Sequence, residues 1–345
     1  MKRTVRPSTP ADSDAIVALL ASAGLHPNAD PRSLHWKYWQ ERGDWRQPRS
    51  FVLTDDSQLI AHGALVPGAL LTQSRRETAA HVIDWVARRG EIGAGVVLMK
   101  HIAQQVGALI AIGGSDDTLR ILPHIGFQGI GLATSYVRPL FPLRRLHGNE
   151  NRDWKTLPRI VRSLAWRAAA PTAVGAGWRT RPVADDAGLE QLAAVLPTAT
   201  ANLTVLERSV GLFRYMLRCP IVSMQLYALE RAAQLRGYFL LASAPGQVRI
   251  VDCWVNSGDP SDWRSMLLCA VAQAKQDAQA SELVIRASDP LLTTVLLRCG
   301  FHRRGETPIR LRPARETPMP ASLLRIQMLD NDAAFFHEGR DEFWA

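Results

Sequence analysis

Residues 80–103 read AHVIDWVARRGEIGAGVVLMKHIA, and this stretch sets the pattern of the chain. Its first eight residues are mostly apolar and predict a strand. Three glycines, Gly90, Gly93 and Gly95, then fall within six residues. The apolar residues of VVLMKHIAQQVG (96–107) recur at helical spacing. The stretch therefore predicts a strand, a glycine-rich turn and an amphipathic helix.

The residues around this stretch predict further helices and strands in one continuous order. Helices are expected where a capping residue precedes a 3.6-residue apolar period, and strands where short apolar runs are bounded by turn formers. In chain order the predicted elements are a helix (12–24), an aromatic helical segment SLHWKYWQERG (33–43), a hairpin (49–73), a strand (76–87), the helix 96–107, a strand (108–114), a helix (116–127) and a strand (131–140).

The second half of the sequence repeats this order. Its elements are RPVADDAGLEQLAAVL (181–196), LFRYMLRCP (212–220), a hairpin (224–243), the strand VRIVDCWVN (248–256), a helix (262–279), a strand (282–288), a helix (289–301) and a strand (309–313). A duplication explains the repeat most economically. We therefore predict a first domain at 1–140, a basic linker with an amphipathic helix at 141–177, and a second domain at 178–345.

Composition limits the class of protein. The chain has 345 residues, of which 47% are hydrophobic and 21% charged, as in ordinary globular proteins. No apolar run reaches the roughly 18 residues of a membrane helix, and the first residues do not form a signal peptide. The four cysteines lie in apolar runs of the second half, which is typical of buried thiols in a reducing cytoplasm. Their spacing predicts no metal site.

The net charge of +9 is concentrated in one segment. Between Arg138 and Arg181 there are ten basic and two acidic residues, a net of +8. Because the excess is local, we expect no nucleic-acid-binding surface over the whole protein. The helix predicted at 157–170 has three interpretations: a solvated linker, a helix that contacts an anionic membrane, or a site of attraction for an acidic ligand.

The repeated order, with Gly126-Phe127 and Gly300-Phe301 each closing the last helix of a half, resembles the GNAT superfamily of acyl-CoA N-acyltransferases. The resemblance covers nearly the whole chain, twice. It implies an α/β (α+β) fold of two tandem GNAT-like domains, each with a mixed, mainly antiparallel sheet flanked by helices.

The segment Trp36-Lys37-Tyr38, the Gly-Ala-Gly sequence at 93–95 and the run AIGGSDDTLRILPHIGF (111–127) are similar to tandem GNAT proteins of bacterial exopolysaccharide and exosortase-type gene clusters. Packing against the sheet is the commoner use of such aromatic residues. Because this helical region flanks the acceptor side in the superfamily, some of them are alternatively expected to line an acceptor cleft.

In the superfamily a loop of the type [RQ]-x-x-G-x-[GA] binds the pyrophosphate of CoA at a helix N-terminus, where free N–H groups favour an anion. In this chain Gly93 and Gly95 take the two glycine positions, and Gly90 stands where Arg or Gln is usual. A flexible turn is the alternative interpretation. The resemblance implies that acetyl-CoA or another acyl-CoA is bound by Val86, Arg88, Arg89, Gly90, Gly93, Ala94, Gly95 and Val96.

The match to the superfamily's catalytic residues is less complete than the match to its glycine loop. Many superfamily members have an Asn and a thiolate-protonating Tyr where this chain has Ser115 and Leu122. Ser115 and His124 are the substitutes that the sequence offers, although a surface histidine is the favoured interpretation of His124. Amine acylation also needs a base. Asp84, in an otherwise apolar strand, is the favoured candidate.

His81 and Glu77 are further candidates for the base on the same strand. Asp252 in VDCW matches Asp84 in the second half, so the pair could instead be structural. The second half has no glycine loop and is expected to be degenerate in cofactor binding. We therefore expect transfer of an acyl group, acetyl first, to an amine on a small molecule or a saccharide. The alternative is a non-catalytic GNAT-like binding or scaffold protein.

Overall fold

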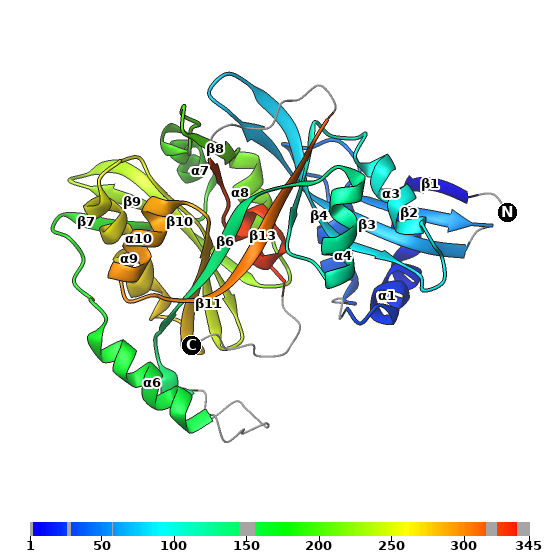
Figure 1. The fold of residues 1–345 in the computed structure, drawn as a ribbon. Helices are drawn as coiled ribbons and strands as arrows, with labels where there is room; N and C mark the ends of the chain where they lie inside the picture. Colours follow the sequence, from blue (N-terminus) through cyan, green and yellow to red (C-terminus); the bar gives the residue numbers. More distant parts are fainter. Residues whose placement is uncertain (1–2, 26–28, 57, 145–155, 315–322, 337–345) are drawn as a thin grey trace.

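The computed structural model describes residues 3–25, 29–56, 58–144, 156–314 and 323–336. Within them lies one sheet of 14 strands, mainly antiparallel, with helices packed on it (Figure 1). Parallel pairing occurs between β4 and β5, between β11 and β12, and between β14 and β8. The predicted mixed, mainly antiparallel sheet flanked by helices is confirmed.

The first half follows the predicted order closely. Its helical elements are η1 (Pro10–Asp12), α1 (Ser13–Ser22), α2 (Pro31–Leu34), the π-helix η2 (His35–Trp39), α3 (Ala94–Ile102), α4 (Asp116–Ile121) and η3 (Leu122–Ile125). Its strands are β1 (Arg3–Pro7), β2 (Ser50–Asp55), β3 (Gln58–Leu71), β4 (Arg76–Ala87), β5 (Ala108–Ile112) and β6 (Gln128–Pro139).

The second half has the same succession, after η4 (Pro142–Arg144) and α6 (Thr156–Ala169). Its strands are β7 (Trp178–Val183), β8 (Leu203–Leu206), β9 (Ser223–Arg231), β10 (Gln234–Ala244), β11 (Gln247–Val255), β12 (Glu282–Ala287), β13 (His302–Pro313) and β14 (Leu323–Arg325). Its helices are α7 (Asp186–Leu192), η5 (Ala193–Val195), α8 (Val210–Met216), α9 (Pro260–Ala274), α10 (Pro290–Arg298), η6 (Met328–Asp330) and η7 (Asp332–Ala334).

The two halves exchange their last long strands. The order along the sheet is β1-β2-β3-β4-β5-β13-β6-β12-β11-β10-β9-β7, so β13 pairs with β5 and β6 pairs with β12. Figure 1 shows β6 and β13 side by side through the centre of the molecule, where they also pair with each other. The domain limits at 140 and 178 therefore stay a prediction, since each half completes its sheet with a strand of the other.

Side-chain caps explain where most of the helices begin. Ser115, Asp185, Asp259 and Asp289 each accept a hydrogen bond from a backbone N–H in the first turn of α4, α7, α9 and α10. Helix α3 differs, because it begins after Gly93, which has a φ of +80° and offers no capping side chain. The N–H groups at the start of α3 are therefore left to other partners.

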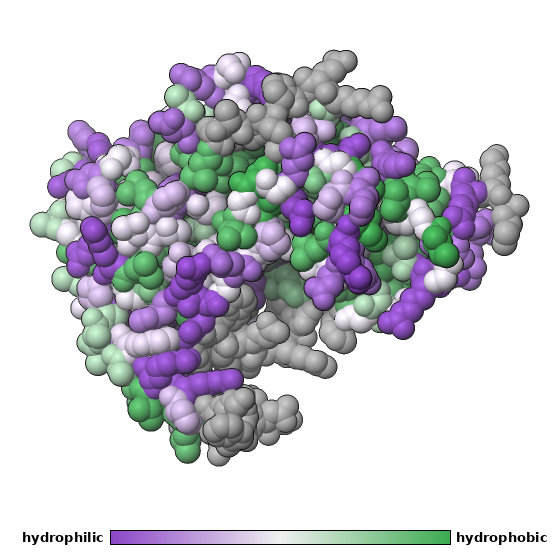
Figure 2. Space-filling model, viewed as in Figure 1, coloured by the Kyte–Doolittle hydropathy of each residue, from purple (hydrophilic) through white to green (hydrophobic). Residues whose placement is uncertain are grey.

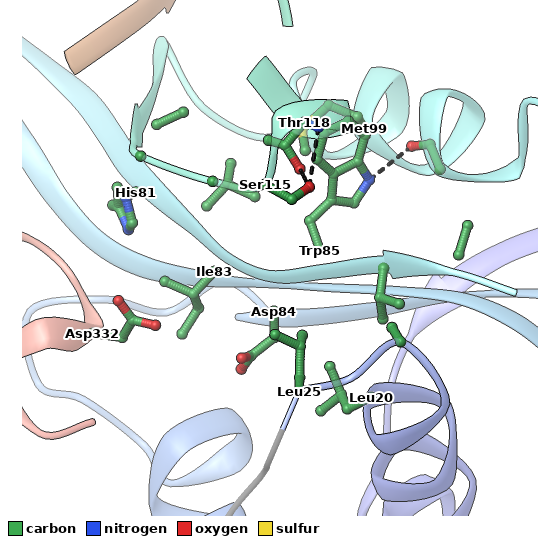
Figure 3. A pocket seen from close by; sticks show the side chains of 18 of the residues that line it. Leu20, Leu25, His81, Ile83, Asp84, Trp85, Met99, Ser115, Thr118 and Asp332 are labelled. Atoms are coloured by element: carbon green, nitrogen blue, oxygen red, sulfur yellow. Dashed lines mark hydrogen bonds between the residues drawn. The ribbon is translucent and has the colours of Figure 1, made fainter. Parts of the chain in front are cut away.

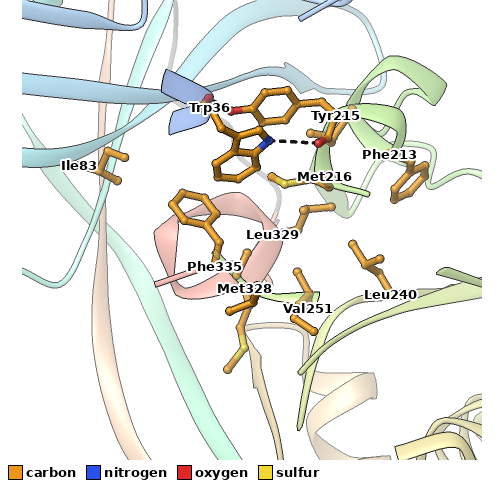
Figure 4. Packing of buried hydrophobic residues seen from close by; sticks show 14 of the residues in the cluster. Trp36, Ile83, Phe213, Tyr215, Met216, Leu240, Val251, Met328, Leu329 and Phe335 are labelled. Atoms are coloured by element: carbon orange, nitrogen blue, oxygen red, sulfur yellow. Dashed lines mark hydrogen bonds between the residues drawn. The ribbon is translucent and has the colours of Figure 1, made fainter. Parts of the chain in front are cut away.

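One core cluster joins the two halves and the C-terminal segment (residues 323–336). In Figure 4, Trp36 from the first half stacks on Tyr215 from the second at 4.7 Å and meets Phe335 edge-on at 5.0 Å. Met328 and Leu329 pack into the same cluster. Burial of this apolar surface stabilises the contact between the halves and holds the C-terminal segment between them.

Helix α6 extends from the body of the molecule at the lower left of Figure 1. It keeps Ile160 buried but leaves Leu157 and Val161 about two-thirds exposed, at 67% and 66%. Figure 2 shows both hydrophilic and hydrophobic side chains on this projection. In the described part of the chain, no helix is long and apolar enough to cross a membrane. All four cysteines are free thiols.

Candidate active site

The site lies where β4 and β5 separate. These two strands pair only from Ala79 to His81 on β4, opposite Ala108 to Ile110 on β5. Beyond that point β4 stays paired with β3 while β5 turns away, and the opening leads into a cavity of about 710 Å³. Parallel strands that diverge expose backbone and side chains of both edges, which suits them to hold an extended ligand.

His81 marks the point of separation. Its Nε2 accepts a hydrogen bond from the backbone N–H of Ile112 at 3.1 Å, which ties β4 to β5. Burial, with a contribution from the positive charge of Arg286, lowers the pKa of His81 to about 3. The imidazole is therefore neutral, and the Nε2 lone pair that a base would need is already engaged. His81 acts here as a structural link.

Strand β4 separates two sides of the cavity, and a bulge in this strand sets which side chains face each side. Asp84 has a φ of +50°, and the register with β3 shifts between His62 and Ala64. Asp tolerates this left-handed conformation better than most residues do. As a result Ile83 and Asp84 point to one side of β4 and Trp85 points to the other (Figure 3). We call these the α1 side and the α3 side of the cavity.

The α3 side contains the glycine-rich turn. Ala94 and Val97 donate their backbone N–H groups to Glu91 and Gly93, at 3.1 and 3.0 Å. Among the described residues no acceptor pairs with the N–H groups of Gly93, Gly95 or Val96. These donors lie at the positive end of a nine-residue helix and beside the cavity, a geometry that suits an anion.

Most of the residues predicted to bind a cofactor gather at this turn. Those that line the cavity are Val86, Arg89, Gly93, Gly95 and Val96. The Trp85 indole donates to the Gly95 carbonyl at 3.0 Å and fixes the start of α3.

Three other predicted residues lie outside the cavity lining. Ala94 is buried in the core, and Gly90 does not line the cavity. Arg88 donates through its guanidinium to the Leu59 carbonyl at 2.9 Å, so it is fixed against β3.

The predicted proton donors are only partly brought together. Ser115 lines the cavity on the α3 side, where its Oγ caps α4 by accepting the Thr118 N–H at 3.2 Å. Leu122 also lines the cavity, so the position of the family's Tyr faces it but has no proton to give. His124 is exposed and lies outside the lining, as does Glu77 at the start of β4.

Asp84 lies on the α1 side in a network of fixed partners. Lys37 Nζ approaches its carboxylate at 2.6 Å, and the Tyr38 hydroxyl donates to it at 2.7 Å. Burial alone would raise the pKa of Asp84, but the charge and hydrogen bond of Lys37, with His62 and Tyr38, outweigh it and lower that pKa. Asp84 is therefore held as a carboxylate, which makes it a weaker proton acceptor.

Sequence reasoning missed a second carboxylate on the α1 side. Asp332, from η7 in the C-terminal segment, lines the cavity together with Phe335 and Phe336. Burial raises the pKa of Asp332, and the nearby charge of Asp84 adds to this against the effect of Lys37. No local pattern marks Asp332 as a site residue, because only the folding of the C-terminal segment between the halves places it there.

The equivalent place in the second half is closed. Asp252 of β11 is fully buried and accepts two hydrogen bonds from Arg208, at 2.8 and 2.9 Å, and one from Tyr238 at 2.6 Å. Where β11 leaves β12, Gln327 bonds both the N–H and the carbonyl of Cys253. The C-terminal segment thus fills the second opening, and the structural interpretation of Asp252 fits this network.

Comparisons with known proteins agree with this architecture. No family model matches the sequence, and no curated protein matches it in sequence. Among solved structures, a GCN5-related N-acetyltransferase from Anabaena variabilis matches with a TM-score of 0.58 and 13% identity, over 90% of this chain and 73% of that one. A GCN5-related N-acetyltransferase from Kribbella flavida matches with a TM-score of 0.55 and 14% identity, over 90% and 71%.

N-myristoyltransferase from Saccharomyces cerevisiae, solved with bound myristoyl-CoA and inhibitors, also matches. Its TM-score is 0.61 at 13% identity, over 92% of this chain and 81% of that one. At these identities the comparisons establish the fold, which is that of GNAT-like acyltransferases.

Proposed function

We propose that the protein transfers an acyl group from acyl-CoA to an amine, at the opening between β4 and β5. The observation that carries the proposal is the uncapped start of α3, whose free N–H groups face the cavity beside two diverging strands. The fold shared with N-acetyltransferases and an N-myristoyltransferase supports the same reaction class.

In this proposal the pyrophosphate of CoA lies against the N–H groups of Gly93, Gly95 and Val96, with Arg89 near the cavity mouth. The thioester arm extends between β4 and β5. Beyond His81, where pairing with β5 ends, backbone N–H groups on that edge of β4 would polarise the thioester carbonyl. The departing thiolate leaves on the α3 side, where the hydroxyls of Ser115 and Thr118 are the nearest proton donors of the lining.

The finer predictions stay part of the proposal. Acetyl is the acyl group that the sequence favours, and an amino sugar or polysaccharide precursor is the acceptor that the gene-cluster resemblance suggests. Asp84 is the base predicted from the sequence. The cytoplasm is the predicted location, and contact of α6 with an anionic membrane is one of the three interpretations of its basic sequence, beside a solvated linker and attraction of an acidic ligand.

A non-catalytic binding role is the second candidate. Leu122 in the position of the family's Tyr and Gly90 in the first position of the loop both favour it. The two candidates differ in thiol release rather than in binding, since both retain the α3 site.

Two measurements test the proposal. Calorimetric titration with acetyl-CoA should give saturable binding to one site, and a thiol-trapping assay should show CoA release that depends on an added amine. Absence of binding at millimolar acetyl-CoA would sink both candidates. Binding without amine-dependent thiol release, over a panel of acyl-CoA lengths and amines, would leave the non-catalytic role.

A further inference from the structure

Asp332 is held rigidly although it lies near the end of the described chain. Asn331, before it, is buried and caps η7 by accepting the Ala333 N–H at 2.8 Å. Arg249 of β11 donates to the carbonyls of Ala333 and Phe336, at 3.1 and 2.6 Å. Two carbonyls of the segment, those of Ala333 and Phe336, are thus tied to β11, which positions the adjacent Asp332.

The carboxylate of Asp332 accepts a hydrogen bond from its own backbone N–H but has no side-chain partner among the described residues. Asp84, by contrast, has Lys37 and Tyr38. Figure 3 shows Asp332 extending from the C-terminal segment toward β4, on the same side as Ile83 and Asp84. A carboxylate placed in a cavity without a side-chain partner is costly to the fold unless a ligand pairs with it.

The charged groups around Asp332 come from four elements. Lys37 on η2 is engaged by Asp84 on β4, at 2.6 Å. Arg249 on β11 is engaged by backbone carbonyls, and Arg286 on β12 donates through Nε to Ser135 at 3.3 Å. Among the described residues no ion pair joins Asp332 to these cations, although the charges of Lys37 and Arg286 act to lower its pKa. The negative charge of Asp332 is thus the one left to be matched by a ligand on the α1 side.

Apolar side chains line much of the α1 side. They are Leu20, Leu25, Leu34, Ile83, Ile221, Phe335 and Phe336, and the polar side chains of Ser22, Ser33, Lys37 and Tyr38 also line the cavity. Alkyl or aromatic groups of a ligand would bury area against these apolar side chains.

We propose that Asp332 binds the acceptor's ammonium group and accepts its proton, and that the acceptor carries an apolar group next to the amine. This proposal rests on the proposed function and assigns to Asp332 the role that the sequence predicts for Asp84. The raised pKa of Asp332 suits it to receive a proton better than the lowered pKa of Asp84 does. Asp84 then serves to hold Lys37.

The reaction balances as follows. The ammonium R–NH₃⁺ gives one proton to the Asp332 carboxylate and becomes R–NH₂. Its nitrogen lone pair forms a C–N bond with the thioester carbonyl carbon, and the C–S bond breaks with its electron pair leaving on sulfur. The second proton leaves the nitrogen and the thiolate becomes CoA–SH, while Asp332 returns its proton to solvent.

A binding experiment tests the recognition step without turnover. Calorimetric titrations at pH 7.5 compare 2-phenylethylamine, which is cationic, with 2-phenylethanol, which has the same apolar body and no charge. The wild-type protein should bind the amine at least tenfold more tightly. Asp332→Asn should remove that preference, while the surface change Asp186→Asn should keep it. Equal affinities in the wild type, a preference that persists in Asp332→Asn, or no binding of the amine would each overturn the proposal.

A kinetic experiment tests the proton step. Using an amine that the wild type acylates, kcat/KM should rise with pH through the raised pKa of Asp332. Asp332→Asn should lower kcat about 100-fold or more and abolish the rise of kcat/KM with pH. Asp332→Glu should recover part of the activity. An unchanged profile in Asp332→Asn refutes the role of Asp332 but leaves acyl transfer intact. Failure of the wild type to release thiol with any amine instead refutes the proposed function.

Discussion

Replacement of Gly93 by Ala separates the cofactor role of the glycine turn from its structural role. Gly93 has a φ of +80°, and a Cβ added there would meet no protein atom within 4 Å. The substitution therefore destabilises the fold only through the left-handed backbone conformation, which costs an L-residue about 1–2 kcal/mol. The free energy of unfolding should fall by that amount and the protein should remain folded.

The free energy of CoA binding should be reduced by more than the free energy of unfolding. The added methyl group would occupy open space at a residue that lines the cavity, beside the free N–H groups of Gly93 and Gly95. Loss of one hydrogen bond to a charged phosphate costs about 1.5–3 kcal/mol, which corresponds to roughly a 10- to 100-fold weaker Kd. Calorimetric titration with CoA measures it directly.

Gly177 provides the matched control. Its φ is +77°, a Cβ there is equally unobstructed, and it precedes β7 far from the cavity. Gly177→Ala should destabilise the fold as much as Gly93→Ala and leave CoA affinity at the wild-type value. CoA affinity in Gly93→Ala within twofold of the wild type would refute the assignment of the phosphates to this turn.

Three further predictions concern the second half, the C-terminal segment and α6. Arg208→Met leaves Asp252 and Asp330 buried without their cation, so chemical denaturation should show a loss of about 3–5 kcal/mol, and a loss under 1 kcal/mol would contradict this. Asp332→Asn should raise the free energy of unfolding at pH 7.5. The pKa of Asp332 is raised in the folded state, so its ionised carboxylate lowers the stability of the wild type at pH values above its unfolded-state pKa. The stability gained by Asp332→Asn should therefore disappear in acid, where the carboxyl is protonated in both states. A variant less stable than the wild type at pH 7.5 would contradict this prediction. The exposed Leu157 of α6 should contact anionic membranes, so the protein should sediment with phosphatidylserine vesicles. Leu157→Glu should weaken vesicle binding about tenfold. Absence of sedimentation of the wild type would contradict the predicted membrane contact.

The local elements could be predicted from sequence because they depend on neighbouring residues. The apolar period of residues 12–24 gives α1, with Ile16, Leu19 and Leu20 buried as that period requires. The hairpin predicted at 49–73 forms from β2 and β3, and Asp56 between them has a φ of +43°. Asp84 and Trp85 point to opposite sides of β4, but the bulge also puts Ile83 on the side of Asp84, which strand alternation alone does not predict.

The exchange of β6 and β13 was not predicted, because a strand's pattern specifies its faces and not its neighbour. Both strands read as ordinary half-buried segments, and either pairing would bury the same residues. The short strands β8 and β14 were also missed, since they pair with each other across more than 100 residues of sequence.

In the candidate site, too, the residues specified by local motifs could be predicted, and those placed by long-range contacts could not. The turn at Gly93 and Gly95 follows from a local motif and lies on the cavity as predicted, whereas His124, from an equally local argument, lies outside it. Lys37 could be noted in the sequence, but its pairing with Asp84 depends on how η2 crosses β4. Asp332 depends on the path of the whole C-terminal segment, which no short pattern encodes.

A crystal structure of the protein with CoA tests the central claim most directly. We expect the pyrophosphate within hydrogen-bonding distance of the N–H groups of Gly93, Gly95 and Val96, and the pantetheine arm between β4 and β5. We expect no CoA between β11 and β12, where Arg325 and Gln327 already bond to Cys253. CoA bound in the second half, or with its phosphates away from the start of α3, would contradict the account.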